Sequence, residues 1–223
     1  MGNGKKLLVF DVDGTLAPHG VSVERAVAAA LCELESRGHT VAFASGKTVE
    51  YLDGLARGLG LTGRCLIAEN GGVIYHNGNI TLMAERPGFF DRLYGEIERL
   101  YPKARMQHNM VNLTALATGE TLEAVVGHLK EAGVLDGKSC RFYLHCDSVE
   151  LLPSGVNKGR ALQKLKGFVG FDTNDVIALG NAQNDEPMRR EASMFLAVGD
   201  EIEADRQFAD AAALMAYLLE VCI

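Results

Sequence analysis

The chain has 223 residues, of which 48% are apolar and 23% charged, so it can form one sizeable core and a smaller second unit. Its formal net charge of −7 argues against a general nucleic-acid-binding surface. It lacks an uninterrupted apolar stretch of about 18 residues, and a core strand is expected directly after the first six residues, which argues against a membrane span and a signal peptide. The five cysteines are odd in number and lack C-x-x-C spacing, which fits reduced thiols in a cytoplasmic protein.

The most informative segment is an apolar strand, residues 7–10, that runs into Asp11, Asp13, Gly14 and Thr15. Glycine allows a sharp turn at the carboxyl end of the strand, where open parallel sheets bind ligands. One carboxylate there can attack phosphorus, and the other can protonate the leaving oxygen and later deprotonate water. An isolated D-x-D is most simply a turn with capping aspartates, but the whole string after an apolar strand favours catalysis.

The first third of the chain alternates strands and helices, which predicts a parallel sheet with right-handed crossovers. An Asn-Gly pair between two apolar runs then predicts a β-hairpin. The predicted strands are 7–10, 41–44, 65–68, 73–76 and 79–82, and the predicted helices are 22–37, with Ser22 as N-cap, and 48–57.

From about residue 83 the pattern changes to helix, strand, helix, strand, strand, which predicts a small α+β insert. The βα alternation returns after Pro153. We therefore expect a core formed by residues 1–82 and 154–223, and an insert formed by residues 83–153. The elements expected from residue 83 onward are 87–101, 110–117, 121–132, 141–146, 149–152, 157–165, 176–179, 186–191, 195–198 and 210–219.

Two further groups suit the binding of an anion. Ser45, Gly46 and Lys47 follow a short apolar strand, where a hydroxyl, backbone N–H groups and a cation can hold a phosphoryl oxygen; an N-cap and turn is an equally good interpretation from these residues alone. Lys158 stands at the start of a predicted helix, where a cation opposes the helix dipole. A solvated lysine is the common case, but a site rich in negative charge would explain it.

Residues 178–188 form a strand, a glycine turn and a helix start that contain Asn181, Asn184 and Asp185. An Asx-turn or helix N-cap at Asn184 or Asp185 is compatible with a binding role. Glu69-Asn70-Gly71-Gly72 follows a third strand and is best interpreted as a turn, with Asn70 as an outer contact.

The four motifs around Asp11, Ser45, Lys158 and Asn181, in this order, resemble those of the haloacid dehalogenase-like (HAD) phosphohydrolases. The position of the insert resembles that of HAD members with a C2B-type cap, and the length resembles the phosphoglycolate and sucrose-phosphate-phosphatase-like branch. The resemblance implies a Rossmann-like parallel sheet flanked by helices, with a small α+β cap. It also implies a phosphatase that acts on a small phosphorylated metabolite, such as a sugar phosphate or 2-phosphoglycolate, through an aspartyl-phosphate.

By this resemblance, Asp11 is the nucleophile and Asp13 the general acid and base. The implied phosphate and substrate ligands are Ser45, Gly46, Lys47, Lys158 and Asn184. The implied Mg²⁺ ligands are Asp11, Asp13 through its carbonyl, Asn181 and Asp185. The chain departs from the family at Asn181, where the family carries an aspartate; an amide oxygen can bind Mg²⁺ but brings no charge, so we expect Asp185 to compensate.

In the cap, His108 and Asn112 are expected to contact the distal end of the substrate. This stretch resembles the cap segment of eukaryotic phosphomannomutases, except that a histidine stands where an arginine is expected. A phosphosugar mutase and a weakly active HAD-like binding protein therefore remain alternatives. We expect a monomer or homodimer with no nucleic-acid or membrane partner.

Overall fold

The computed structural model describes residues 4–222. The chain divides into two compact units, residues 1–81 with 157–223, here called the core unit, and residues 82–156, here called the cap unit. The cap unit is thus an insertion between two sections of the core unit, and each is described by itself.

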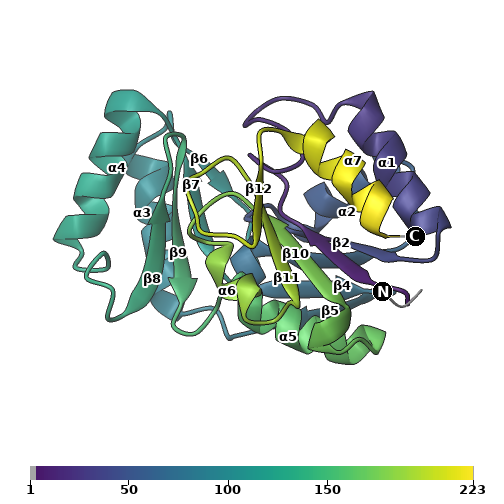
Figure 1. The fold of residues 1–223 in the computed structure, drawn as a ribbon. Helices are drawn as coiled ribbons and strands as arrows, with labels where there is room; N and C mark the ends of the chain where they lie inside the picture. Colours follow the sequence, from purple (N-terminus) through teal and green to yellow (C-terminus); the bar gives the residue numbers. More distant parts are fainter. Residues whose placement is uncertain (1–3, 223) are drawn as a thin grey trace. The chain divides into compact units, whose positions relative to one another are not determined.

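The described part of the core unit is built on an eight-stranded sheet with the order β12-β11-β10-β1-β2-β3-β4-β5 (Figure 1). Neighbouring strands from β12 to β3 are parallel, whereas β4 is antiparallel to β3. The strands are β1 (Leu7–Phe10), β2 (Thr40–Ala44), β3 (Cys65–Ala68), β4 (Val73–His76), β5 (Asn79–Leu82), β10 (Val176–Gly180), β11 (Met194–Val198) and β12 (Arg206–Phe208).

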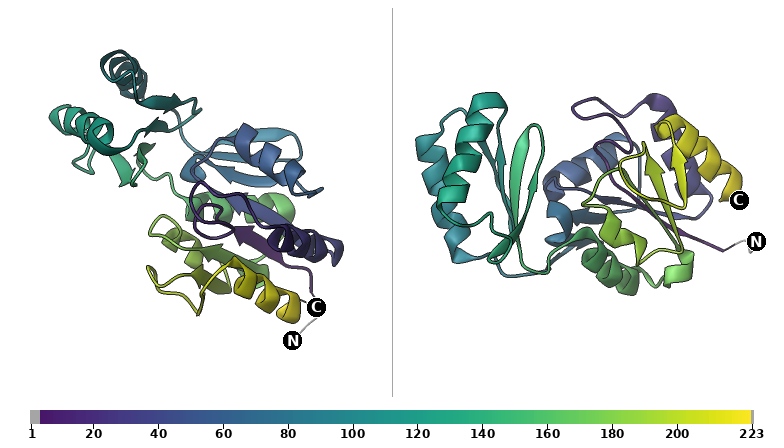
Figure 2. Two further views of the ribbon diagram at one scale, coloured as in Figure 1. Left: turned by 90° about the horizontal axis from the view of Figure 1, so that it is seen from above. Right: turned by 60° about the vertical axis from the view of Figure 1, so that its left-hand side comes forward.

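Helices cover both faces of this sheet, so its central strands are apolar along their whole length. All four residues of β1 are buried, as are all five of β10. Helices α1 and α7 pack together on one side, and α5 and α6 pack together on the other (Figures 1 and 2). The helices are α1 (Arg25–Ser36), α2 (Val49–Gly58), α5 (Lys158–Val169), α6 (Glu186–Arg189) and α7 (Ala211–Val221).

The strand order reverses at the pair β1 and β10. From β1 the sheet grows through β2 to β3 in one direction, and from β10 through β11 to β12 in the other. Ligands of open α/β sheets bind outside the carboxyl ends of the strands at such a switch point. In this chain, that position is occupied by the loops that follow Phe10 and Gly180.

The cap unit has a four-stranded antiparallel sheet with the order β6-β7-β9-β8, and two helices that pack on one face of it (Figure 1). Apolar side chains from the helices and from alternate strand positions, including Phe90, Val125 and Leu151, form its core. The elements are α3 (Gly88–Leu100), β6 (Arg105–Gln107), β7 (Leu113–Leu116), α4 (Gly119–Glu131), β8 (Cys140–Leu144) and β9 (Ser148–Pro153).

The α/β fold with a parallel sheet is confirmed, and so is the hairpin, whose turn residues Asn77 and Gly78 have φ values of 50° and 83°. The predicted N-cap Ser22 is wrong: α1 begins three residues later, with Glu24 as a cap residue that makes no side-chain cap hydrogen bond. The strand expected at 110–117 is only Leu113–Leu116, because residues 108–112 form a loop. Strands β6 and β12 were not predicted, because each has three residues and lies at a sheet edge.

Two expectations from composition also hold within residues 4–222. All five cysteines are free. In this range, the helices are too short or too polar to cross a bilayer.

Glu35, near the end of α1, fixes the loop that leads into β3. Its carboxylate accepts hydrogen bonds from the backbone N–H of Thr62 (2.9 Å) and of Gly63 (2.7 Å), and from the Thr62 hydroxyl (2.9 Å). Partial burial raises the pKa of Glu35, but these donors outweigh it and hold the pKa below the ordinary value of 4.5. The ionised form therefore stabilises the fold above about pH 4.5, and this stabilisation is lost as the pH falls through the lowered pKa.

We predict that Glu35→Gln lowers the free energy of unfolding by about 1 kcal/mol at pH 7, because charge-assisted hydrogen bonds are replaced by weaker ones. Urea unfolding from pH 7 to pH 3 should show this difference shrink below pH 4.5. Glu33→Gln, which removes only an exposed ion pair with Arg37 (2.6 Å), is the control and should have a smaller effect. A constant difference down to pH 3 would contradict this role of Glu35.

Candidate active site

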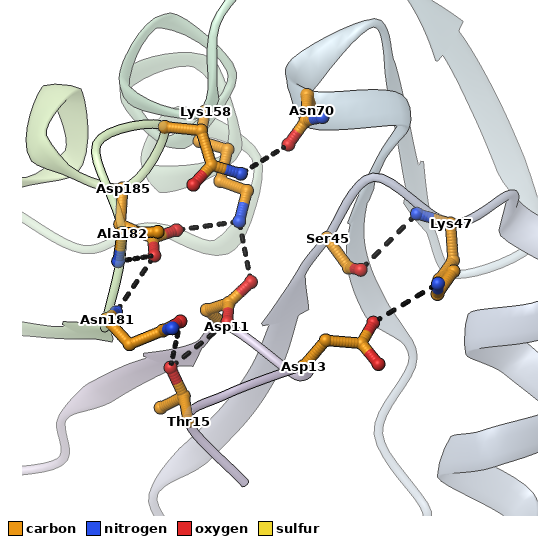
Figure 3. A network of polar contacts seen from close by, with 11 residues as sticks. Asp11, Asp13, Thr15, Ser45, Lys47, Asn70, Lys158, Asn181, Ala182 and Asp185 are labelled. Carbon is orange, nitrogen blue, oxygen red and sulfur yellow. Dashed lines mark hydrogen bonds and ion pairs between the residues drawn. The ribbon is translucent and has the colours of Figure 1, made fainter. Parts of the chain in front are cut away.

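Four adjacent parallel strands, β10, β1, β2 and β3, end at the same edge of the core sheet. The residues that follow them, Asn181, Asp11, Ser45 and Glu69, are therefore brought to this edge, although they are spread over most of the sequence. Figure 3 shows Asn181, Asp11 and Ser45 together with Asn70, the residue after Glu69. Side chains from the starts of α5 and α6 complete the group.

The centre of the group is Lys158, a lysine that is 1% exposed. Its Nζ donates to Asp11 Oδ1 and to Asp185 Oδ1, both at 2.6 Å (Figure 3). Burial alone would lower the pKa of Lys158, but the charges and hydrogen bonds of the two carboxylates outweigh it and raise the pKa. Lys158 is therefore a permanent cation that neutralises carboxylates on two different loops.

The pKa of Asp11 is also set by opposing effects, but here burial outweighs the neighbouring cation. Burial and the charge of Asp185 raise its pKa to about 7, against the opposing effect of Lys158 and of the hydroxyl of Thr15, which donates to Asp11 Oδ2 at 3.0 Å. A carboxylate that is poorly solvated in this way is a stronger nucleophile than one in water.

Asp185 is fully buried, and both of its oxygens have protein partners. Oδ1 accepts from Lys158, and Oδ2 accepts the backbone N–H groups of Asn181 (3.0 Å) and Ala182 (3.1 Å). The sequence predicts Asp185 as a compensating metal ligand, and as a candidate cap of α6. In the structure, its carboxylate holds the turn before α6 and contacts Lys158, but it makes no side-chain cap hydrogen bond, so the predicted cap is wrong and the metal role stays a prediction.

Asp13 is on the other side of the Asp11 loop and is partly exposed. Its Oδ2 lies 3.4 Å from Lys47 Nζ, and the backbone N–H of Lys47 donates to Ser45 Oγ at 3.3 Å (Figure 3). Gly46 lies between them in the loop from β2 to α2. The structure thus brings the loop from β2 to α2 next to Asp13. Ser45 in this loop is buried, whereas Asp13 keeps access to solvent.

Asn181 packs against the loop that carries both aspartates. Its side-chain amide lies within 3.2 Å of the Asp13 carbonyl oxygen and the Thr15 hydroxyl, and within 3.1 Å of Asp11 Oδ2. A Cβ on Gly14, where φ is +91°, would lie 2.2 Å from this amide. The glycine is therefore needed both for the turn and for this close approach.

Asn184 lies at the opposite side of the same turn, and its Nδ2 donates to Asn70 Oδ1 at 3.0 Å. Asn70 and the preceding Glu69 have φ values of 50° and 52°, which are unusual for residues with a side chain and indicate a constrained loop. Asn70 was predicted only as an outer contact, and Thr15 was given no role. The only sequence signal for a role of Thr15 is that it follows Asp11 by four residues in the same loop.

The two predicted cap residues differ in their surroundings within the cap unit. His108 is exposed, and its Nδ1 lies 3.3 Å from the hydroxyl of Tyr94. Asn112 is fully buried, and its backbone carbonyl accepts from Arg86. His108 therefore remains a candidate substrate contact, whereas the surroundings of Asn112 favour a role in holding the cap loop to the segment that precedes α3.

The donor chemistry of the site fits a magnesium ion. Within residues 4–222, three or more acidic, histidine or cysteine side chains never gather into a group that can hold a metal. However, Mg²⁺ commonly uses one or two carboxylates together with neutral oxygens, waters and substrate phosphate. The Asn181 amide lies 3.2 Å from the Asp13 carbonyl oxygen and 3.1 Å from Asp11 Oδ2, so these three groups offer such a set.

Comparison with known proteins identifies the family of this chain. The sequence profile of the haloacid dehalogenase-like hydrolases matches residues 8–87 and 96–215, which is most of the chain. The chain therefore belongs to this family. Proteins named phosphoglycolate phosphatase are similar along most of their length: that of Methanopyrus kandleri is 29% identical over 92% of this chain and 88% of its own, and that of Picrophilus torridus is 30% identical over 82% and 74%. The protein is accordingly a phosphatase, a phosphoric monoester hydrolase.

Solved structures support the same fold. A haloacid dehalogenase-like hydrolase from Bacteroides thetaiotaomicron has a TM-score of 0.80 at 20% identity, and it aligns over 98% of this chain and 100% of its own. BT4131, described as a HAD subclass IIB sugar phosphatase, has a TM-score of 0.67 at 16% identity, with 97% and 98% coverage. HAD phosphatases are in general metal-dependent, which agrees with the set of oxygen atoms described above.

We predict that Lys158→Met lowers the free energy of unfolding by about 3–5 kcal/mol, because two buried carboxylates lose their cation. Adding Asp185→Asn should restore part of the loss, since one of the uncompensated charges is removed. Urea unfolding measures both.

The matched control is Lys166→Met, which removes another buried lysine, paired with Glu191 at 2.9 Å. It should also destabilise the protein, but Asp185→Asn should not rescue it. Equal rescue of the two lysine variants would contradict a specific coupling between Lys158 and Asp185.

Proposed function

We propose that this phosphatase hydrolyses a small phosphorylated metabolite in two steps, through an aspartyl-phosphate on Asp11, with Mg²⁺ as cofactor. The observation that carries the proposal is the contact of Lys158 with Asp11 at 2.6 Å in a site closed to solvent on that side, with Asp13 two residues further along the loop. A nucleophile, a fixed cation and a partly exposed second carboxylate are the groups that such a reaction needs.

In the first step, a carboxylate oxygen of Asp11 attacks phosphorus and forms a new P–O bond. The ester P–O bond breaks, and the leaving oxygen takes a proton from Asp13. Lys158 stays charged throughout and stabilises the negative charge on the phosphoryl oxygens, while Ser45, Gly46 and Lys47 can donate to them from the neighbouring loop.

In the second step, Asp13 accepts a proton from water, and the water oxygen attacks the phosphorus of the aspartyl-phosphate. The bond between phosphorus and Asp11 breaks, and inorganic phosphate and the free carboxylate are released. The exposure of Asp13 supports this role, because it must meet both the leaving group and water.

Asp11, the Asp13 carbonyl and the Asn181 amide oxygen would hold Mg²⁺. When bound, the ion supplies positive charge to the phosphoryl oxygens and helps to orient them. Asp185 contributes through Lys158 and through the backbone of the Asn181 turn.

The names of the relatives favour 2-phosphoglycolate as the first substrate to test, with sugar phosphates second. We propose that the cap unit selects among them, with the exposed His108 as a contributor. A screen of phosphorylated metabolites that records both phosphate release and isomer formation would distinguish a phosphatase from a phosphosugar mutase.

We predict that Asp11→Asn abolishes turnover, because an amide is not a competent nucleophile, and that Asp13→Asn lowers kcat by about 10²–10⁴-fold, because proton transfer is lost. The measurement is Mg²⁺-dependent phosphate release from 2-phosphoglycolate and from an aryl phosphate. Asp175→Asn, which removes an exposed partner of Lys6, is a control that should keep full activity. Substantial turnover by Asp11→Asn would contradict the covalent mechanism.

For the cap, we predict that His108→Ala changes KM among natural phosphate esters by more than it changes turnover of an aryl phosphate. Steady-state kinetics on three or more esters measure this. Equal losses on every substrate would indicate that His108 is not involved in selection.

A further inference from the structure

The side-chain amide of Asn181 can face the Asp11 loop in two ways. With Oδ1 toward the loop, it accepts from the Thr15 hydroxyl at 3.2 Å (Figure 3). With Nδ2 toward the loop, the nitrogen lies 3.2 Å from the Asp13 carbonyl oxygen, 3.2 Å from Thr15 Oγ1 and 3.1 Å from Asp11 Oδ2.

The two orientations suit different states of the site. The Asp13 carbonyl and the ionised Asp11 carboxylate can only accept hydrogen bonds, and the one hydroxyl hydrogen of Thr15 can serve either Asp11 Oδ2 or Asn181 Oδ1, so without a cation a further donor is favourable. The Nδ2 orientation provides two N–H groups to these oxygens, whereas the Oδ1 orientation places a third oxygen against them. Only a cation among the three oxygens makes the second arrangement favourable.

We propose that Asn181 replaces the cation in the metal-free protein, with its NH₂ group bonded to Asp11 Oδ2 and the Asp13 carbonyl, and that its amide turns over to offer Oδ1 when Mg²⁺ binds. The inference rests on the metal site of the proposed function. It assigns to this asparagine a role that an aspartate cannot have, because a carboxylate has no hydrogen to donate.

The charges around the amide explain why an asparagine suits position 181 better than an aspartate in the metal-free protein. Asp11, Asp13 and Asp185 bring three carboxyl groups close to the loop, and Lys158 and Lys47 bring two amino groups. A fourth carboxylate at position 181 would face Asp11 Oδ2 at about hydrogen-bond distance without a cation between them. Asparagine avoids that repulsion, and it gives up affinity for the metal.

Close packing keeps the Asn181 amide against the Asp11 loop. A Cβ on Gly14 would lie 2.2 Å from the Asn181 amide, so the side chain is held against the loop and not directed to solvent. The backbone of Asn181 is fixed as well, because its N–H donates to Asp185 Oδ2 at 3.0 Å. Rotation of the amide about its last bond is therefore the simplest available change.

The test compares wild type, Asn181→Asp and Asn181→Ala at a single pH. Thermal unfolding is measured in EDTA and in excess Mg²⁺, and Mg²⁺ binding is measured by calorimetry on the metal-free proteins. Asn157→Asp is the control for an added charge, because Asn157 caps α5 by accepting from Arg160 N–H, and aspartate caps equally well.

We expect both variants to melt below wild type in EDTA, because each loses the two N–H donors. Asn181→Asp should bind Mg²⁺ more tightly than wild type by about tenfold or more, and excess Mg²⁺ should remove its deficit in melting temperature. Asn181→Ala should gain no affinity, and the control should change neither property.

An Asn181→Ala or Asn181→Asp protein that melts with wild type in EDTA would overturn the inference, since the amide would then carry no stabilising contact in the metal-free state. Failure of every variant to bind Mg²⁺ would instead refute the metal site of the proposed function, while the melts in EDTA would still decide whether the amide stabilises the loop. Should Asn181→Asp fail to fold, the alanine variant decides the question by itself.

Discussion

The arrangement of the site depends on one buried lysine between two carboxylates. An ammonium group that is almost completely removed from water costs several kcal/mol unless it is paired, and Lys158 is paired twice at 2.6 Å. The pairing requires the loops after β1 and β10 to approach the start of α5 closely. Gly159 permits this approach, since a Cβ there would lie 2.2 Å from the carbonyl oxygen of Pro187, which belongs to α6. Charge neutralisation and backbone packing thus constrain each other.

This constraint explains why the chemistry is located where it is. The sheet supplies the position, because the carboxyl ends of β10, β1, β2 and β3 lie side by side at the switch point. In the proposed reaction, the lysine supplies a fixed positive charge before any substrate binds, so little reorganisation is needed when phosphoryl charge develops. The three aspartates around it differ in their surroundings. Asp11 is buried, Asp13 is partly exposed, and Asp185 contacts the lysine and the Asn181 turn.

Much of this could be predicted from the sequence, because the relevant signals are local. Residues 7–10 form an apolar run of strand length, Asn77-Gly78 is a turn sequence, and the aspartates follow their strand directly. Strands β6 and β12 escaped prediction because an edge strand of three residues is stabilised by the hydrogen bonds of its neighbour and has no apolar run of its own. The partners of Asp185 and Asn181 were also out of reach. They depend on which oxygen faces which donor where loops meet, and residue spacing does not encode this: Asp185 and Lys158 are 27 residues apart, and Asn181 and Thr15 are 166 apart.

The central claim is that Asp11 is phosphorylated during turnover, and chemical trapping tests it most directly. Enzyme mixed with a turned-over phosphate ester and Mg²⁺ is quenched in acid, reduced with borohydride and digested, and the peptides are sequenced by mass spectrometry. A carboxyl group that carries phosphate is reduced to an alcohol, so the account predicts homoserine at position 11, only in samples that contained substrate. Homoserine at position 13 or 185, or its absence at every position while substrate is being hydrolysed, would contradict the account.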